Sequence, residues 1–96
     1  MDKIEDMIRT VRGVMRVRPG DSVWVSNREE CVESRSVVVT LLWEYGMTDE
    51  QVAKMFGFTR QGVNKLRHGC SDKMVRKVRV KEAYVEGRKV MRRDDI

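Results

Sequence analysis

The sequence predicts an all-α domain of about five helices. Apolar residues recur at helical spacing in several segments, capping residues and glycines bracket those segments, and one proline stands among 96 residues. A helical chain of this length can close one hydrophobic core but has no room for a second. We therefore expect a single domain over residues 1–96, with its core at about 2–70 and a basic C-terminal helix at about 72–91.

The first helix is expected over about residues 2–16, where charged side chains separate apolar ones at helical spacing. Pro19 and Gly20 follow this stretch and are expected to end the helix. The next apolar residues, 23–25, predict a short extended linker that is pinned to the core.

A second, longer helix is predicted at about residues 27–45. Ser26 and Glu29 have the spacing of a capping box before it, and Gly46 follows it. The three consecutive valines at 37–39 are β-branched, so propensity alone favours a strand here. We favour the helix because the cap and the glycine bracket a stretch much longer than a usual strand.

Residues 48–69 predict two short helices that meet at Gly57. Thr48 can cap the first of them, with Gln51 three residues later to complete a capping box. Gly57 supplies the left-handed backbone that ends this helix, and Thr59 can cap the next one. Two short helices joined by a tight turn are typical of the helix-turn-helix that binds DNA.

The second of these helices, at about residues 59–68, is the predicted recognition helix. Val63 and Leu66 lie three residues apart, on one face of this helix, and are expected to pack it against the preceding helix. Polar side chains then occupy the opposite face. Each of these polar residues also has an ordinary structural alternative: a helix cap for Thr59, a solvated helix end for His68, and a solvated helix face for the other four. These polar side chains can bond base edges or phosphates in a major groove, and they belong to Thr59, Arg60, Gln61, Asn64, Lys65 and His68.

The remaining predictions concern helix ends and the core. Gly69 is expected to end the recognition helix, and Ser71 to cap the last helix. Gly87 is expected to bend or fray the end of that last helix, whereas Gly62 either allows close approach to the DNA backbone or is simply tolerated. Three apolar residues define one face of the last helix, namely Met74, Val78 and Val85. The aromatic residues expected in the core are Trp24, Trp43, Tyr45, Phe56 and Phe58.

Positive charge is concentrated in the C-terminal part of the chain. Residues 1–58 hold 8 Lys or Arg and 10 Asp or Glu, whereas residues 59–93 hold 12 Lys or Arg and 3 Asp or Glu. The excess begins at the predicted recognition helix, which suits the counterion release that accompanies binding to a phosphate backbone. Within this segment, the densest basic run either clamps phosphates or forms a solubilising face; it consists of Lys73, Arg76, Lys77 and Arg79.

The composition argues against several other functions. Cys31 and Cys70 lie far apart, no CxxC occurs and His68 is the single histidine, so no metal site has ordinary ligand spacing. Charged residues stand where a secretory signal would have its apolar core, and no apolar run is long enough to span a bilayer. We expect a cytoplasmic protein with free thiols, no cofactor, no small-molecule substrate, no membrane contact and no enzyme activity.

Four features occur in a particular order along the chain: an amphipathic N-terminal helix, a basic loop Ser26-Asn-Arg28, a pair Ser34-Arg35 early in a long helix, and the run from Met47 to Gly57. Over about residues 4–66 this order resembles the C-terminal DNA-binding domain (domain IV) of the bacterial replication initiator DnaA, which has a Trp repressor-like helical fold. The resemblance implies that Arg28 enters the minor groove and that Arg35 contacts the DNA backbone. Without it, Arg28 is an ordinary residue at the start of a helix.

The chain departs from that family at the recognition helix. The family carries Asp-His-Ser/Thr-Thr-Val where this chain has Thr59-Arg60-Gln61-Gly62-Val63, so we do not expect it to recognise the initiator's own origin sequence. No GxxxxGK(S/T) phosphate loop occurs, so ATP binding is not implied.

Our hypothesis is therefore a protein that binds double-stranded DNA, as a small accessory factor or regulator of transcription or replication. The alternative is a protein–protein interaction module that keeps the helical fold without binding DNA. The sequence does not define the oligomeric state.

Overall fold

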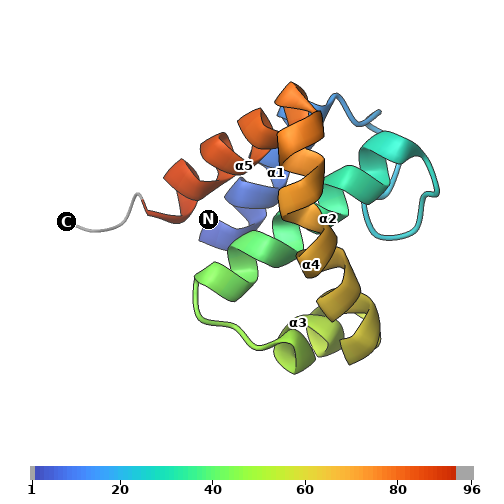
Figure 1. Ribbon diagram of the computed structural model, residues 1–96, viewed down its shortest axis with the longest axis vertical. Helices are drawn as coiled ribbons and strands as arrows, with labels where there is room; N and C mark the ends of the chain where they lie inside the picture. Colours follow the sequence, from blue (N-terminus) through green and yellow to red (C-terminus); the bar gives the residue numbers. More distant parts are fainter. Residues whose placement is uncertain (1, 93–96) are drawn as a thin grey trace.

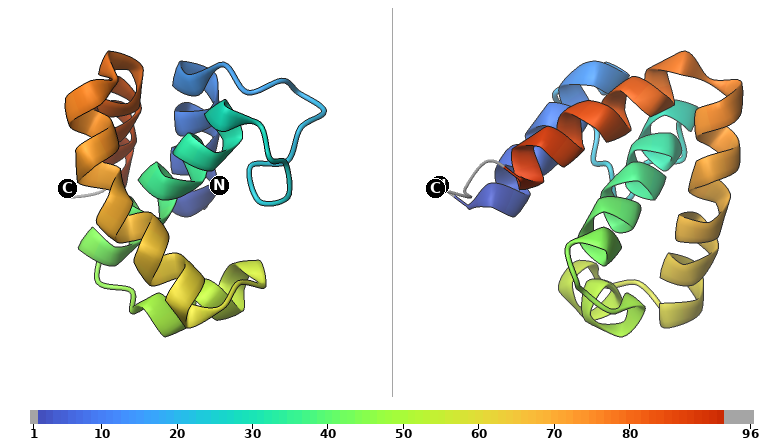
Figure 2. Two further views of the ribbon diagram at one scale, coloured as in Figure 1. Left: turned by 45° about the vertical axis from the view of Figure 1, so that its right-hand side comes forward. Right: turned by 60° about the vertical axis from the view of Figure 1, so that its left-hand side comes forward.

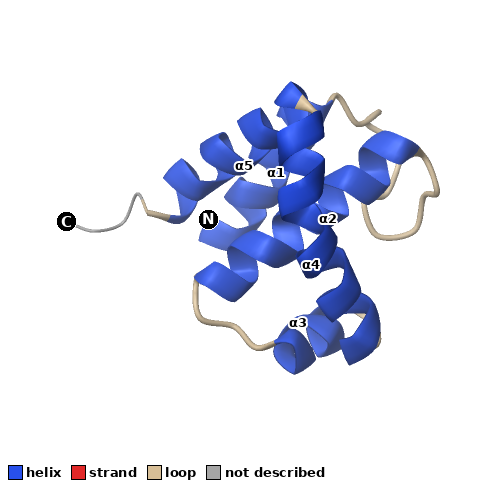
Figure 3. Ribbon diagram, viewed as in Figure 1, coloured by secondary structure: helices blue, strands red, loops and turns tan. Residues whose placement is uncertain are grey.

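The computed structural model of the chain describes residues 2–92, and within that range it contains five α-helices and no strand (Figures 1 and 3). This confirms the predicted all-α fold class with about five helices. Met1 and residues 93–96 lie outside the described residues, so Arg93, the last residue of the basic segment, is among them. The helices are α1 (Lys3–Met15), α2 (Glu29–Glu44), α3 (Asp49–Phe56), α4 (Arg60–Arg76) and α5 (Val78–Met91).

The central helix is α2, which packs against each of the other four helices. Its valines at 37–39 are fully buried, and ten of its residues are buried in all. A helix surrounded on all sides carries apolar residues around its whole circumference, so the β-branched run fits a buried helix. Tertiary packing here outweighs the strand propensity of the valines, and the predicted second helix is confirmed.

The ends of the first two helices differ from the prediction. α1 ends at Met15 because Arg16 adopts a left-handed conformation, with φ 57°, before Pro19 is reached. Residues 23–25 form a turn instead of an extended linker, since the Ser26 N–H bonds to the Ser22 carbonyl at 3.1 Å. The capping box predicted at Ser26 is also wrong. The Ser26 hydroxyl accepts a hydrogen bond from the Arg28 N–H, and α2 begins at Glu29 without a side-chain cap.

The largest correction concerns the C-terminal helices. Gly69 does not end the recognition helix, and Ser71 does not cap a new one, because α4 continues through both to Arg76. The C-terminal half of α4 packs on α2, with Cys70 fully buried, and this packing holds the glycine in helical geometry. The chain breaks instead at Lys77, whose backbone is extended (φ −130°, ψ 115°), and α5 begins after it.

α5 lies antiparallel to α1 along one side of the molecule (Figure 2). Gly87 is buried where these two helices meet α2, and α5 continues as a helix through it to Met91. The prediction that Gly87 bends or frays the end of this helix is therefore wrong. An added Cβ at this position would lie 2.6 Å from Leu41 Cδ1 and 3.1 Å from Val11 Cγ2. The absence of a side chain therefore sets how closely α5 approaches its neighbours.

Several apolar residues lie on other faces than predicted. On α5 the buried residues are Val80, Ala83, Gly87, Val90 and Met91, whereas Val78 and Val85 are exposed. Trp43 and Tyr45 are about half exposed, so their predicted place in the core is wrong. The other three aromatic residues, Trp24, Phe56 and Phe58, are partly buried and pack against the core as expected.

Candidate nucleic-acid interface

The site begins with the junction between α3 and α4, whose local structure follows the predicted caps. The Thr48 hydroxyl accepts a hydrogen bond from the Gln51 N–H at 3.1 Å, and the Gln51 side chain accepts one from the Thr48 N–H at 2.9 Å. Gly57 ends α3 with φ 76°, a left-handed conformation that favours glycine. Thr59 then caps α4. These local bonds fix where α3 ends and α4 begins.

The outward face of α4 carries four polar side chains on its first turns. Arg60, Gln61, Lys65 and His68 are exposed, and within residues 2–92 none of them takes part in a side-chain hydrogen bond or ion pair. Val63, on the opposite side of the helix, is fully buried. The structure thus brings together four of the six polar residues predicted for this face in a form available to a ligand.

The other two predicted residues of this face are engaged within the protein. The Thr59 hydroxyl accepts the Gly62 N–H at 3.0 Å, which is the cap of α4. A Cβ added to Gly62 would lie 3.0 Å from that same hydroxyl oxygen, closer than ordinary contact. Glycine at this position therefore leaves room for the cap, a structural reason that sequence reasoning did not supply. The Asn64 amide donates to Asp49 Oδ2 at 3.0 Å.

Asp49 is the centre of a polar network that joins α3 to α4. Besides Asn64, the Arg67 guanidinium donates to both of its carboxylate oxygens, at 3.0 and 2.9 Å, and both side chains are only about 15% exposed. The bonds from Arg67 lower the pKa of Asp49 below its ordinary value of 3.8, although burial opposes this. Arg67 also stacks over the Trp43 ring, 4.4 Å from its centroid. The network orients the start of α4 relative to α3.

Sequence reasoning did not single out Arg67 or Asp49. The available signal was that Asn64 and Arg67 lie three residues apart, so they share a face of α4 on which an acidic partner can be bound. Asp49 is the first residue of α3, where the positive end of the helix dipole also stabilises a carboxylate.

The loop between α1 and α2 packs beside the α3–α4 junction. Trp24 stacks on Phe56 with ring centroids 3.9 Å apart, and its ring lies 5.6 Å from that of Phe58. Arg35 of α2 donates to the Val23 carbonyl and to the Ser26 carbonyl, each at 2.8 Å. The Arg35 guanidinium thus holds the protein's own loop, whereas the family resemblance assigned it to the DNA backbone.

Arg28 stands at the end of this loop, as the residue before α2. Its Nε lies 3.2 Å from Asp21 Oδ2, and about half of its side chain is exposed. Asp21 Oδ2 is buried and accepts no hydrogen bond within the described residues, so the ion pair with Arg28 is the contact that satisfies it. Arg28 thus braces the loop between α1 and α2, and the rest of its side chain faces solvent.

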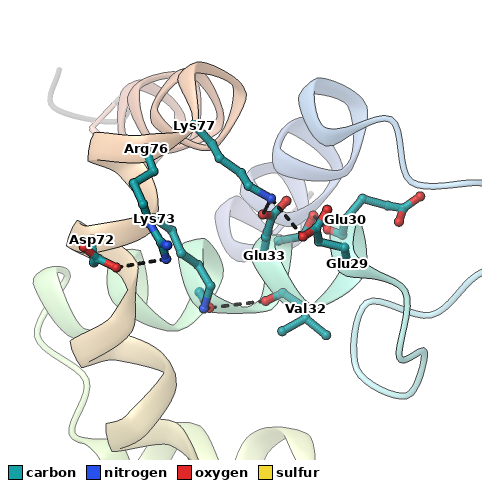
Figure 4. A network of polar contacts seen from close by, with 10 residues as sticks. Glu29, Glu30, Val32, Glu33, Asp72, Lys73, Arg76 and Lys77 are labelled. Carbon is teal, nitrogen blue, oxygen red and sulfur yellow. Dashed lines mark hydrogen bonds and ion pairs between the residues drawn. The ribbon is translucent and has the colours of Figure 1, made fainter.

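Three of the four basic residues predicted to clamp phosphates are engaged within the protein (Figure 4), whereas Arg79 is exposed. Lys77 contacts Glu33 at 2.6 Å and Glu29 at 2.9 Å, and these hydrogen bonds raise its pKa. Arg76 lies 2.9 Å from Asp72 one helical turn away. Lys73 points back toward α2, where its Nζ donates to Ser36 Oγ at 3.3 Å. The polar network of Figure 4 therefore holds the α4–α5 corner against the start of α2.

Neither cysteine is placed for chemistry at this site. Cys31 and Cys70 are both buried and free, and burial raises the pKa of the Cys70 thiol. In the described part of the chain, no helix combines the length and apolar character needed to cross a membrane. In comparisons with protein-family models, curated proteins and solved structures, nothing matches this chain.

Proposed function

We propose that this protein binds double-stranded DNA with the N-terminal half of α4 in the major groove. The observation that carries the proposal is the row of Arg60, Gln61, Lys65 and His68, which is exposed and unpaired within the described residues. Arginine and lysine bond the acceptor edge of guanine or a phosphate, and glutamine can bond adenine at two positions. The row thus offers donors for two base types and for the backbone.

Rigid attachment of this row supports the proposal. A base-reading helix needs a fixed orientation, and α4 is held by the Asp49 network, by its Thr59 cap and by Val63 in the core. The contrast with the other end of α4 points the same way. There Arg76 and Lys77 already neutralise carboxylates, whereas Arg60 and Lys65 have no such partner among the described residues.

Two neighbouring features extend the proposed contact. The loop that ends at Arg28 is tied to the α3–α4 junction through Trp24, and about half of the Arg28 side chain is exposed. The resemblance to DnaA implies that this arginine enters an adjacent minor groove, and we include that contact in the proposal. Arg60 lies beside Asp49 and Glu50, whose carboxylates are already paired with Arg67 and Lys54. Arg60 is therefore available to contact a base or a phosphate. The role we propose is that of a small regulator or accessory factor in transcription or replication.

We expect Arg60→Ala and Lys65→Ala each to lower duplex affinity about tenfold, the loss of one good base or phosphate contact. The measurement is fluorescence anisotropy of labelled duplexes from a random-sequence pool, titrated at two salt concentrations. The slope of log affinity against log salt should fall by about 1 for a residue that contacts phosphate.

The control is Lys89→Ala, which removes an exposed positive charge from α5, far from this face, where Lys89 pairs with Glu86 at 3.1 Å. It should leave both affinity and salt slope close to those of the parent protein. Equal losses for all three variants would indicate nonspecific charge effects. No salt-dependent binding at micromolar protein would refute the proposal.

A further inference from the structure

The α4–α5 corner carries an apolar surface that DNA binding does not use. It forms a shallow hollow of about 530 Å³. Val75 and Val78 are 85% and 80% exposed, and Val85 is 39% exposed. We call this the elbow surface; it consists of Met74, Val75, Val78, Lys81, Glu82 and Val85, with Glu86 at its edge.

The other exposed apolar residues do not form a comparable surface. Arg67 covers the ring of Trp43, and Lys3 lies over the ring of Tyr45. Val25 and Met55 are single exposed residues on other elements, and such residues are normal on a protein surface. Within residues 2–92, the elbow surface is thus where exposed valines gather, and a gathered apolar patch indicates an interaction site.

The charges on the elbow surface indicate the kind of partner. Lys81 and Glu82 are adjacent, exposed and of opposite sign, and among the described residues neither side chain forms an ion pair. A purely acidic partner would repel Glu82, and a purely basic partner would repel Lys81. Phosphates of nucleic acid or lipid would meet both Glu82 and Glu86. A second copy of the same surface, however, offers each charge its opposite.

We infer that the elbow surface binds a second copy of this chain, through antiparallel packing of the two α5 helices around a two-fold axis. When the axis passes between positions 81 and 82, Val78 lies opposite Val85 of the second copy. In the same register, Lys81 lies opposite Glu82 of the second copy. Two-fold symmetry repeats both pairings, so the interface has four matched contacts.

This interface is separate from the proposed DNA contact. The α4–α5 corner, which carries the elbow surface, lies at the end of α4 away from α3 (Figure 1), and Gly62 and Arg76 are about 21 Å apart along the helix. Dimerisation therefore leaves Arg60 and Lys65 exposed in both copies. Because this pairing involves four side chains from each copy, we expect the dimer to dissociate in the micromolar range.

The test is sedimentation velocity of the full chain without DNA, over a range of micromolar concentrations. The parent protein should double in mass as concentration rises, and Val78→Glu should stay monomeric. Val25→Glu is the matched control, because Val25 is equally exposed, at 79%, but lies in the loop between α1 and α2; this variant should dimerise like the parent. Circular dichroism should show the same helix content for all three proteins.

A charge exchange tests the register itself. Lys81→Glu and Glu82→Lys should each weaken dimerisation at least tenfold, since each places like charges opposite one another, and the double exchange should restore it. A parent protein that remains monomeric overturns the inference. So does a dimer that survives Val78→Glu, or a double exchange that rescues nothing.

Discussion

Replacement of Gly87 by valine is expected to destabilise the protein by about 3 kcal/mol, because the new side chain has no space where α5 meets α1 and α2. Its Cβ alone would lie 2.6 Å from Leu41 Cδ1 and 3.1 Å from Val11 Cγ2, and both of these side chains are buried in the core, so the helices must shift to admit the larger residue. The melting temperature should fall by more than about 10 °C for a domain of this size. Thermal or urea denaturation followed by circular dichroism at 222 nm would measure the change.

Gly13→Val is the matched control for this prediction. Gly13 also lies inside a helix, but it is exposed and an added Cβ would meet nothing within 4 Å. Because valine has a somewhat better helix propensity than glycine, this variant should be as stable as the parent or slightly more stable. A Gly87→Val protein as stable as Gly13→Val would contradict the close packing of α5.

The second large effect is expected at the network that joins α3 to α4. Asp49→Ala should destabilise the protein by about 2 kcal/mol, since it leaves the Arg67 guanidinium, which is 15% exposed, without its carboxylate. Glu50→Ala, at the next position of the same helical turn, removes an exposed carboxylate whose ion pair with Lys54 spans 4.0 Å and should have little effect. Urea denaturation of both variants at neutral pH would separate the two cases.

The same network makes a prediction about pH. The pKa of Asp49 is lower in the folded protein than its ordinary value, so its contribution to stability is complete above that value and is lost as pH falls through the folded-state pKa. The difference in stability between the parent and Asp49→Ala should therefore be constant near neutral pH and shrink below about pH 4. A difference that stays constant down to pH 2 would exclude the ionised carboxylate as its source.

Short-range patterns predicted much of the candidate site. Thr48, Gln51, Gly57 and Thr59 act within one helical turn of their own positions, so their caps could be read from sequence and are confirmed. The exposure of Arg60, Gln61 and Lys65 followed from the helical period, given Val63 as an inward residue. The same period places Asn64 and Arg67 on one face of α4, but it does not identify the side chain to which they bond.

Long-range contacts decided those cases. Asn64 and Arg67 bond Asp49 across 15 and 18 positions of the chain, and Arg35 reaches a loop carbonyl 12 positions away. Lys73 and Ser36 are 37 positions apart. Such partners depend on which helices pack together and at what angle they cross. The spacing of residue types along one helix does not determine either.

The sequence by itself determined that the chain is helical, where α3 begins and ends, and which face of α4 points outward. The reason is that caps and helical periodicity are set by residues three or four positions apart. Only the tertiary structure decided that α4 continues through Gly69, that Gly87 is buried and that Val78 is exposed. Those outcomes depend on burial of one helix against another, which outweighs the local preference of a single glycine or valine.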